Sequence, residues 1–312
     1  MEVNVETVDV IIPVYKPDRG FLTLIERIQA QTVPVNRIIL MNTEQKYLDR
    51  LLYGTTLERQ AHNITVKHLS KREFDHGRTR NQGVKLSEAD VFVMMTQDAI
   101  PADDYLLERL LDHLRKEKAA VSYARQLPTE DSGEIERYTR QFNYPGESCV
   151  KTKEDLPRLG IKTFFCSNVC AAYDRETFDR LGGFVNHTIF NEDMLYAAKA
   201  VEAGCRIAYA ADACVYHSHN YTHRQQFHRN FDLGVSQAEH PEVFAKYPSE
   251  SEGIRMVKGL VAYLSENGMK NKIPYVIIQS AFKYAGYLCG KNYRRLPVRL
   301  RTALSSNREY WQ

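Results

Sequence analysis

The sequence of 312 residues lacks the features that would place it across a membrane, in the secretory pathway or on nucleic acid. No apolar run reaches the ~18–20 residues that a membrane-spanning helix needs. The first residues, Met1–Glu6, are acidic and have no apolar signal-peptide core, so we expect a cytoplasmic protein. A net charge of +3 is too small to favour nucleic acid as a partner.

Paired cysteines are also missing, because none of the six cysteines has C-x-x-C spacing. In a cytosolic chain such cysteines are expected to be reduced and buried, not disulfide-bonded or zinc-bound. The remaining composition is ordinary for a globular protein and leaves room for one large domain or two smaller ones.

Apolar runs alternate with helical patterns over the first two thirds of the chain. Four of these runs predict strands: Val8–Tyr15, Arg37–Met41, Ile64–Leu69 and Val91–Met95. Helical spacing between them predicts β-α-β units, whose strands run parallel and cross over right-handed. We therefore expect an α/β fold with a Rossmann-like, mostly parallel sheet flanked by helices.

The later part of the chain changes in character. Periodicity fades between about 125 and 162, which predicts a long insertion or lid. Strands are expected at 164–173, 206–210 and 213–217, and helices dominate after about 223. These patterns predict a catalytic domain at 1–222, with halves of about 1–124 and 125–222, and a helical C-terminal extension at 223–312.

Two acidic positions stand where chemistry is expected. Asp98 follows the run Val91–Met95, and open sheets bind ligands at the carboxyl ends of their strands. Glu192 and Asp193 open a helical pattern much later in the chain. Together they predict a metal-assisted transfer site with a separate base. The alternatives are a turn or helix cap at Asp98 and a first helical turn at Glu192 and Asp193 whose acids stabilise the helix dipole by only ~0.3–1 kcal/mol.

Four motifs occur in the order found in family 2 glycosyltransferases of the GT-A fold, which the chain resembles over roughly residues 8 to 235. They are Ile11-Ile12-Pro13-Val14-Tyr15, Arg80-Asn81-x-Gly83, Thr96-Gln97-Asp98 and Glu192-Asp193. More narrowly, Phe74–Asn81 and Thr96–Ala99 resemble bacterial rhamnosyltransferases of that family, which use dTDP-L-rhamnose. The resemblance implies an inverting transfer to a hydroxyl of a cell-surface polysaccharide or lipid-linked saccharide.

The resemblance also implies a metal site. In this family the last carboxylate of a DxD-like motif holds Mg²⁺ or Mn²⁺ on the donor diphosphate, a position that Asp98 occupies here, with Gln97 beside it. Thr96 replaces the first Asp of that motif, so the diphosphate and water would supply most other ligands. His217 is the expected further ligand, with a purely structural histidine as the alternative. The nearby histidines lack zinc spacing.

The family's inverting base corresponds to Asp193, with Glu192 expected to orient the acceptor or Asp193. A carboxylate with an ordinary pKa near ~4 is ionised at neutral pH and can accept a proton from an acceptor hydroxyl during attack.

Donor contacts are expected at strand ends and at one helix start. Pro13, Val14 and Tyr15, with Asn42 and Thr43, should line the pocket for a thymine or uracil ring. The helix start should place four residues on the diphosphate, because helix N-termini and Arg favour phosphate. They are His76, Gly77, Arg80 and Asn81. Tyr15 could instead lie in the core, and Arg80 could simply be solvated.

A basic, amphipathic segment ends the chain. Ile277, Ala281, Tyr284 and Leu288 share one helical stripe, and several Lys and Arg residues follow. Such a segment favours peripheral contact with anionic lipid at the inner face of the plasma membrane. The alternative is a stripe that packs into the core.

Three other functions remain open at this point. The donor could be UDP-glucose or UDP-GlcNAc, since pocket shape decides between similar sugars. A nucleotidyltransferase would also use carboxylate-bound Mg²⁺, but the segment Tyr15–Gly20 is a poor phosphate loop. A non-catalytic scaffold would not need both Asp98 and Asp193.

Overall fold

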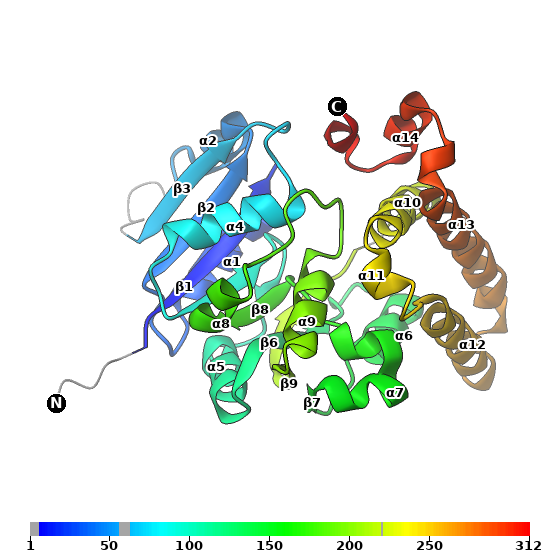
Figure 1. Cartoon of the computed structure of the whole chain (residues 1–312), viewed down its shortest axis with the longest axis horizontal. Coiled ribbons are helices and arrows are strands. Elements are labelled where there is room, and N and C mark those ends of the chain that lie inside the picture. Colours follow the sequence, from blue (N-terminus) through cyan, green and yellow to red (C-terminus); the bar gives the residue numbers. More distant parts are fainter. Residues whose placement is uncertain (1–5, 56–62, 220) are drawn as a thin grey trace.

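The computed structural model describes residues 6–55, 63–219 and 221–312. Figure 1 shows a twisted sheet with flanking helices, followed by a group of helices at the C-terminal end. Among the described residues the sheet has nine strands, ordered β3-β2-β1-β4-β8-β6-β9-β5, with β7 paired to β9.

The first half of the sheet follows the predicted pattern. Its strands are β1 (Val8–Tyr15), β2 (Arg37–Thr43), β3 (Ile64–Leu69) and β4 (Val91–Met95). All are parallel, so their carboxyl ends meet at one edge. Helix α1 (Arg19–Gln29) begins at Asp18, whose carboxylate accepts a hydrogen bond from Gly20 N at 2.9 Å, and it buries one apolar face on this sheet.

The second half is mixed in direction. Strand β8 (Cys170–Asp174) runs antiparallel to both β4 and β6 (Ala119–Leu127). Strand β9 (Arg206–Tyr216) is parallel to β6 but antiparallel to β5 (Ile100–Pro101) and β7 (Cys149–Lys151). Only the first half of the sheet is therefore parallel throughout, and the second half departs from the expected mostly parallel sheet. The sequence could not predict this difference, because an apolar run does not reveal the direction in which its strand enters the sheet.

Residues 125–162 hold more regular structure than the sequence predicted. They contain the end of β6, helix α6 (Glu134–Asn143), β7 and helix α7 (Leu156–Leu159). The strand expected at 164–173 begins only at Cys170. The two strands expected at 206–217 are one strand, β9, whose pairing with β6 shifts register between Ala124 and Arg125. Helix α2 (Gln45–Leu52) was not predicted.

The C-terminal region is helical, as predicted. Its helices are α10 (His223–Glu239), α11 (Pro241–Phe244), α12 (Glu250–Glu266), α13 (Ile273–Lys291) and α14 (Val298–Leu304). Helices α10 and α13 cross closely because glycines face the partner backbone; a Cβ on Gly290 would lie 2.0 Å from Phe231 O. Within the described ranges, no helix combines the length and apolar character needed to cross a bilayer.

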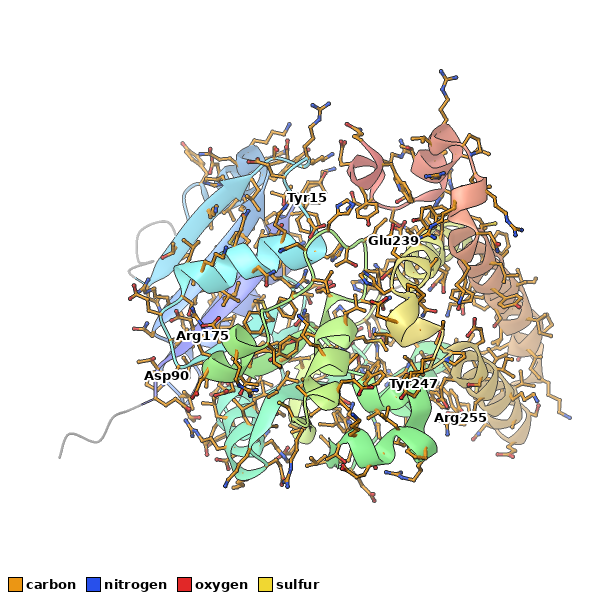
Figure 2. The ribbon with its side chains drawn as sticks, in the orientation of Figure 1. Tyr15, Asp90, Arg175, Glu239, Tyr247 and Arg255 are labelled. Atoms are coloured by element: carbon orange, nitrogen blue, oxygen red, sulfur yellow. The ribbon has the colours of Figure 1, made fainter. Side chains whose placement is uncertain are left out.

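Side-chain contacts join this region to the rest of the molecule. The ring of Tyr247 meets Phe164 edge-on, with centroids 5.2 Å apart, and the Arg255 guanidinium lies 5.1 Å from the Phe142 ring. Figure 2 shows Tyr247 and Arg255 where α11 and α12 adjoin the second half of the sheet region.

Candidate active site

Asp98 lies with two histidines at the carboxyl end of the sheet. Its Oδ1 is 3.5 Å from His217 Nε2 and its Oδ2 is 3.3 Å from His219 Nε2. His217 and His219 follow the end of β9, while Asp98 follows β4. Their three ligand atoms lie within 4.8 Å of one another. The structure thus brings Asp98 and His217 together as the sequence predicted, and it adds His219.

The charge state of this cluster suits a divalent cation. Burial alone would raise the pKa of Asp98, but contacts with His217 and His219 outweigh it and hold that pKa well below the ordinary value. Burial and the neighbouring His217 lower the pKa of His219 to about 4. An ionised carboxylate beside a neutral imidazole is the form that a metal binds. Because nitrogen ligands are present, the set fits Mn²⁺ better than Mg²⁺, which prefers oxygen.

Glu192 is held in a buried polar network at the start of α9 (Glu192–Glu202). Its Oε1 is 3.2 Å from Arg80 Nε and accepts a hydrogen bond from Asn168 Nδ2 at 3.0 Å. Its Oε2 is 3.9 Å from His76 Nδ1. Burial would raise the pKa of Glu192, but Arg80 and His76 lower it below the ordinary value. Glu192 is therefore an ionised, fixed carboxylate rather than a solvated helix-start acid.

Asp193 has a different environment, although it is the next residue. Its Oδ2 accepts a hydrogen bond from Asn168 N at 3.0 Å, and its Oδ1 accepts one from Met194 N at 2.8 Å. Burial, together with the negative charge of Glu192, raises the pKa of Asp193 to about 7. A carboxylate with a raised pKa is a stronger base than an ordinary one, which suits proton abstraction near neutral pH.

Short contacts connect the two acidic clusters. Thr96, two residues before Asp98, donates its N–H to Val169 O at 3.1 Å, and the neighbouring Asn168 binds Asp193. A second path runs through Gln126, which contacts His217 Nδ1 at 2.9 Å and Ser167 Oγ at 3.0 Å. Both acidic clusters are therefore connected by hydrogen bonds to the segment at 167–169.

A pocket of about 380 Å³ is lined by His76, whose Nδ1 lies 3.9 Å from Glu192, but not by Asp98, Asp193 or the two histidines beside Asp98. On the sheet side it is lined by Tyr15, Thr43, Lys71, Phe74 and His76. The opposite wall consists of Ile189, Phe190, Arg229, Asp232 and the segment 306–309. Figure 2 shows Tyr15 near the end of β1, facing the helical region that carries Glu239. The C-terminal region thus forms one wall of the pocket.

Only some of the residues expected to bind the nucleobase of the donor lie at the pocket. Tyr15 is 36% exposed, and Gln97 holds its backbone by two hydrogen bonds, Tyr15 N to Gln97 Oε1 at 2.8 Å and Gln97 Nε2 to Tyr15 O at 3.0 Å. Tyr15 and Thr43 line the pocket, whereas Pro13 does not. Val14 belongs to the apolar core. Asn42 is fully buried, with Nδ2 2.9 Å from His68 Nδ1. These positions do not favour contact between the nucleobase and the side chains of Val14 and Asn42.

The start of α4 (His76–Leu86) packs against the loop before α9, a role that the sequence did not indicate. A Cβ on Gly77 would lie 1.7 Å from Val185 O, so only glycine permits this close approach. Asn81 Nδ2 donates to Phe184 O at 2.9 Å, and its Oδ1 accepts from Phe184 N at 3.0 Å. Arg80 is buried against Glu192. Gly77, Arg80 and Asn81 therefore hold the loop before α9, and direct diphosphate contact by them is not favoured; His76 does line the pocket.

Three further residues contact the acidic clusters or line the pocket, although sequence reasoning did not assign them these roles. His219 lies two residues after His217, so its side chain points the same way along an extended segment, and this spacing was the available signal. Asn168 joins both acids but sits in an irregular turn. Arg229 lies on α10 between the rings of Tyr221 and Phe190, at 4.7 and 5.5 Å. No ion pair involves Arg229 among the residues that the structure describes.

Comparison with known proteins gives a family and two similar curated proteins. Residues 9–182 match the family model described as Glycosyl transferase family 2. The chain is 37% identical over 306 residues to the O-antigen chain rhamnosyltransferase RfbN of Salmonella typhimurium, with 97% of this chain and 96% of that protein covered. It is 39% identical over 285 residues to the O-antigen chain rhamnosyltransferase WbaN of Salmonella anatum, with 91% and 88% covered.

Solved structures show the same fold at low identity. TarS of S. aureus in complex with UDP-GlcNAc matches with a TM-score of 0.53 and 16% identity, covering 93% of this chain and 92% of that one. The mannosyltransferase PcManGT from Pyrobaculum calidifontis, in complex with GDP-Man and Mn²⁺, gives 0.61 and 13%, covering 93% and 88%. At such identities these structures support the architecture alone.

Proposed function

Since the chain belongs to glycosyl transferase family 2 and has a GT-A-like fold, we propose that it moves L-rhamnose from dTDP-L-rhamnose to a saccharide hydroxyl. The acceptor would be a growing O-antigen-type polysaccharide or its lipid-linked precursor. Support for the sugar comes from the two O-antigen chain rhamnosyltransferases that the chain resembles over most of its length. Support for the chemistry comes from one observation above all, the hydrogen bonds that connect Thr96, two residues before Asp98, through the segment at 167–169 to Asp193.

The pocket offers a path for the donor. Tyr15 and Thr43 supply an aromatic face and a hydroxyl at the strand ends, where the nucleobase of the donor would lie. Lys71 and Arg229 supply positive charge from opposite walls. Arg229 would contact the diphosphate, because its guanidinium forms no ion pair among the described residues and can form charge-assisted hydrogen bonds to phosphate oxygens.

The metal-binding residues in this proposal are Asp98, His217 and His219. A divalent cation bound there would neutralise the negative charge that builds on the leaving diphosphate. Gln126 contacts His217 at Nδ1 and so leaves Nε2 directed toward Asp98. Asp98 remains ionised across the neutral range because its pKa is lowered.

Asp193 would act as the base of an inverting displacement. The acceptor oxygen forms the new bond to the anomeric carbon while the bond from that carbon to the diphosphate oxygen breaks. The hydroxyl proton passes to the Asp193 carboxylate, and the leaving diphosphate takes the bonding electrons. The hydrogen bonds from Asn168 N and Met194 N fix both carboxylate oxygens, and Glu192 raises the basicity of Asp193 through its charge.

Two further parts of the proposal concern organisation. Residues 1–222 would form the catalytic domain, and 223–312 would be an extension that completes the donor pocket through Arg229 and the segment at 306–309. Peripheral contact with an anionic membrane would bring a lipid-linked acceptor to the site.

A donor panel tests the proposal. The purified protein is assayed with Mn²⁺, a lipid-linked or synthetic acceptor, and dTDP-L-rhamnose, UDP-glucose or UDP-GlcNAc. We expect turnover with dTDP-L-rhamnose and a product with inverted anomeric configuration by NMR. Turnover with UDP-glucose alone would replace the donor assignment, and retained configuration would remove the single-displacement role of Asp193.

A further inference from the structure

Helix α13 exposes a wide apolar face, and the ring of His223 covers only part of it, at Tyr275 and Phe282. Ile277, Ala281, Tyr284 and Leu288, at helical spacing, all point outward, so the stripe seen in the sequence does not pack into the core. Ile277 is 58% exposed and Tyr284 57% exposed. The exposed large apolar side chains of this helix are Tyr275, Ile277, Ile278, Phe282, Tyr284 and Leu288. In Figure 1, α13 lies at the outer edge of the molecule, on the side away from the sheet.

Basic residues surround this face at both ends. Lys270 and Lys272 precede α13, while Arg294, Arg295 and Arg299 follow it. From Asn267 to Arg308 the sequence has nine basic residues and no acidic one, although the whole chain is nearly balanced at 42 basic and 39 acidic. Positive charge is thus segregated beside an exposed apolar surface. Isolated exposed apolar residues are common, but a continuous face with a basic rim marks an interaction site.

We propose that the outward face of α13, with its flanking basic residues, docks on an anionic membrane surface. The apolar side chains would enter the boundary between headgroups and acyl chains, and the Lys and Arg side chains would contact lipid phosphates. Each basic residue near an anionic surface strengthens binding by roughly fivefold. The contact is peripheral, because α13 lies along the surface of the protein as one helix of a packed group.

A second copy of the chain is a poorer occupant of this face. A two-fold contact would place the same surface on both partners, so basic residues would face basic residues without acidic ones to pair with them. An anionic lipid surface has the complementary charge, and it therefore accounts for both the apolar and the basic parts of the face.

A chain of contacts connects α13 to the proposed metal-binding residues. His223 follows the metal-binding segment and stacks on Phe282, with ring centroids 5.3 Å apart and planes at 14°. Burial lowers the pKa of Lys283, and the charge of Glu136 on α6 partly offsets the shift, so Lys283 lies near that helix. Arg140, one turn later on α6, is hydrogen-bonded to Gln126, which contacts His217. Docking through α13 would thus hold the site close to a lipid-linked acceptor, a consequence that rests on the proposed function.

Vesicle co-sedimentation tests the inference without any donor or acceptor, so its result is independent of transferase activity. The full chain is mixed with vesicles of phosphatidylglycerol and phosphatidylcholine, or of phosphatidylcholine alone. We expect binding to the anionic vesicles only, weakened by salt. The double substitution Ile277→Ser with Ile278→Ser should weaken binding about tenfold, and Arg295→Glu with Arg299→Glu should weaken it at least about 25-fold.

Matched controls separate docking from general surface change. Ile254→Ser removes an apolar residue of equal exposure, 57%, from α12, and Lys85→Glu reverses an exposed charge on α4. Both should bind like the unchanged protein, and circular dichroism should show the same fold in all variants. Equal binding to neutral vesicles, no binding to either kind, or binding unaffected by the α13 substitutions would overturn the inference. So would a dimer in sedimentation velocity that the Ile277 and Ile278 substitutions dissociate.

Discussion

The two acidic clusters use the same residue types in opposite ways. Asp98 is 43% exposed beside two histidines, and its pKa is lowered, so it keeps a negative charge. Burial and the neighbouring ionised Glu192 raise the pKa of Asp193, so it holds a proton more readily. One environment makes a carboxylate a cation ligand and the other makes it a base. Neighbouring charge, not residue type, separates the two roles.

Removing the base should have the largest effect on activity. Asp193→Asn keeps the size of the side chain but cannot accept the acceptor proton, so kcat should fall by ~10²–10⁴-fold. Donor affinity, measured by calorimetry with dTDP, should be unchanged because Asp193 is not part of the pocket lining. Asp179→Asn, an exposed carboxylate on α8 (Arg175–Arg180), serves as the control. Activity near that of the unchanged protein would remove Asp193 from the mechanism.

Breaking the pair that fixes Glu192 should chiefly affect stability. Arg80→Gln leaves a buried carboxylate without its cation, and one-sided removal of a buried ion pair costs about 3–5 kcal/mol. Urea unfolding measures this loss. The double variant with Glu192→Gln should regain much of it, because no unpaired charge remains. Equal stability of the Arg80→Gln variant and the unchanged protein would show that His76 and Asn168 alone hold Glu192.

Weakening the metal cluster should have a smaller and partly reversible effect. Asp98→Asn removes the carboxylate of the Asp98–His217–His219 set, so activity at low Mn²⁺ should fall roughly a hundredfold. Raising the Mn²⁺ concentration should recover part of it, and a chelator should abolish activity in both proteins. His219→Asn should raise the Mn²⁺ requirement as His217→Asn does. If only His217→Asn raises the Mn²⁺ requirement, His219 is not a metal ligand and its role is structural.

The sequence predicted the parts of this site that lie at the ends of strands or helices. Asp98, His217 and Asp193 each follow or begin a regular element that periodicity predicts, while the roles expected of His217 and Asp193 came from the family resemblance. The contacts of Asn168 with both acids could not be predicted, because it sits in an irregular turn and is fixed by Tyr173, whose hydroxyl donates to Asn168 Oδ1 at 2.7 Å. Arg80 was predicted to contact the donor diphosphate, because nothing local indicates that Glu192 is buried against it.

The fold was likewise predictable only where local sequence patterns determine it. Strands β1 to β4 were predicted because each is a continuous apolar run between polar turns. The direction of β8 and the pairing of β7 with β9 depend on contacts between distant segments, which periodicity does not encode. The outward stripe of α13 was visible in the sequence, but whether it was buried depended on how α13 packs against α10.

The pH dependence of kcat tests the contrast between the clusters most finely. Because the pKa of Asp193 is raised, its base form should be lost as the pH falls below neutrality, with a loss approaching tenfold per pH unit. Asp98 has a lowered pKa, and that of His219 is about 4, so these two ligands keep their charge state in this window. Glu192→Gln removes the negative charge beside Asp193 and should move the acid limb to lower pH. A limb at the same pH in both proteins would mean that a group other than Asp193 titrates, and that the two carboxylates do not differ in the way their surroundings imply.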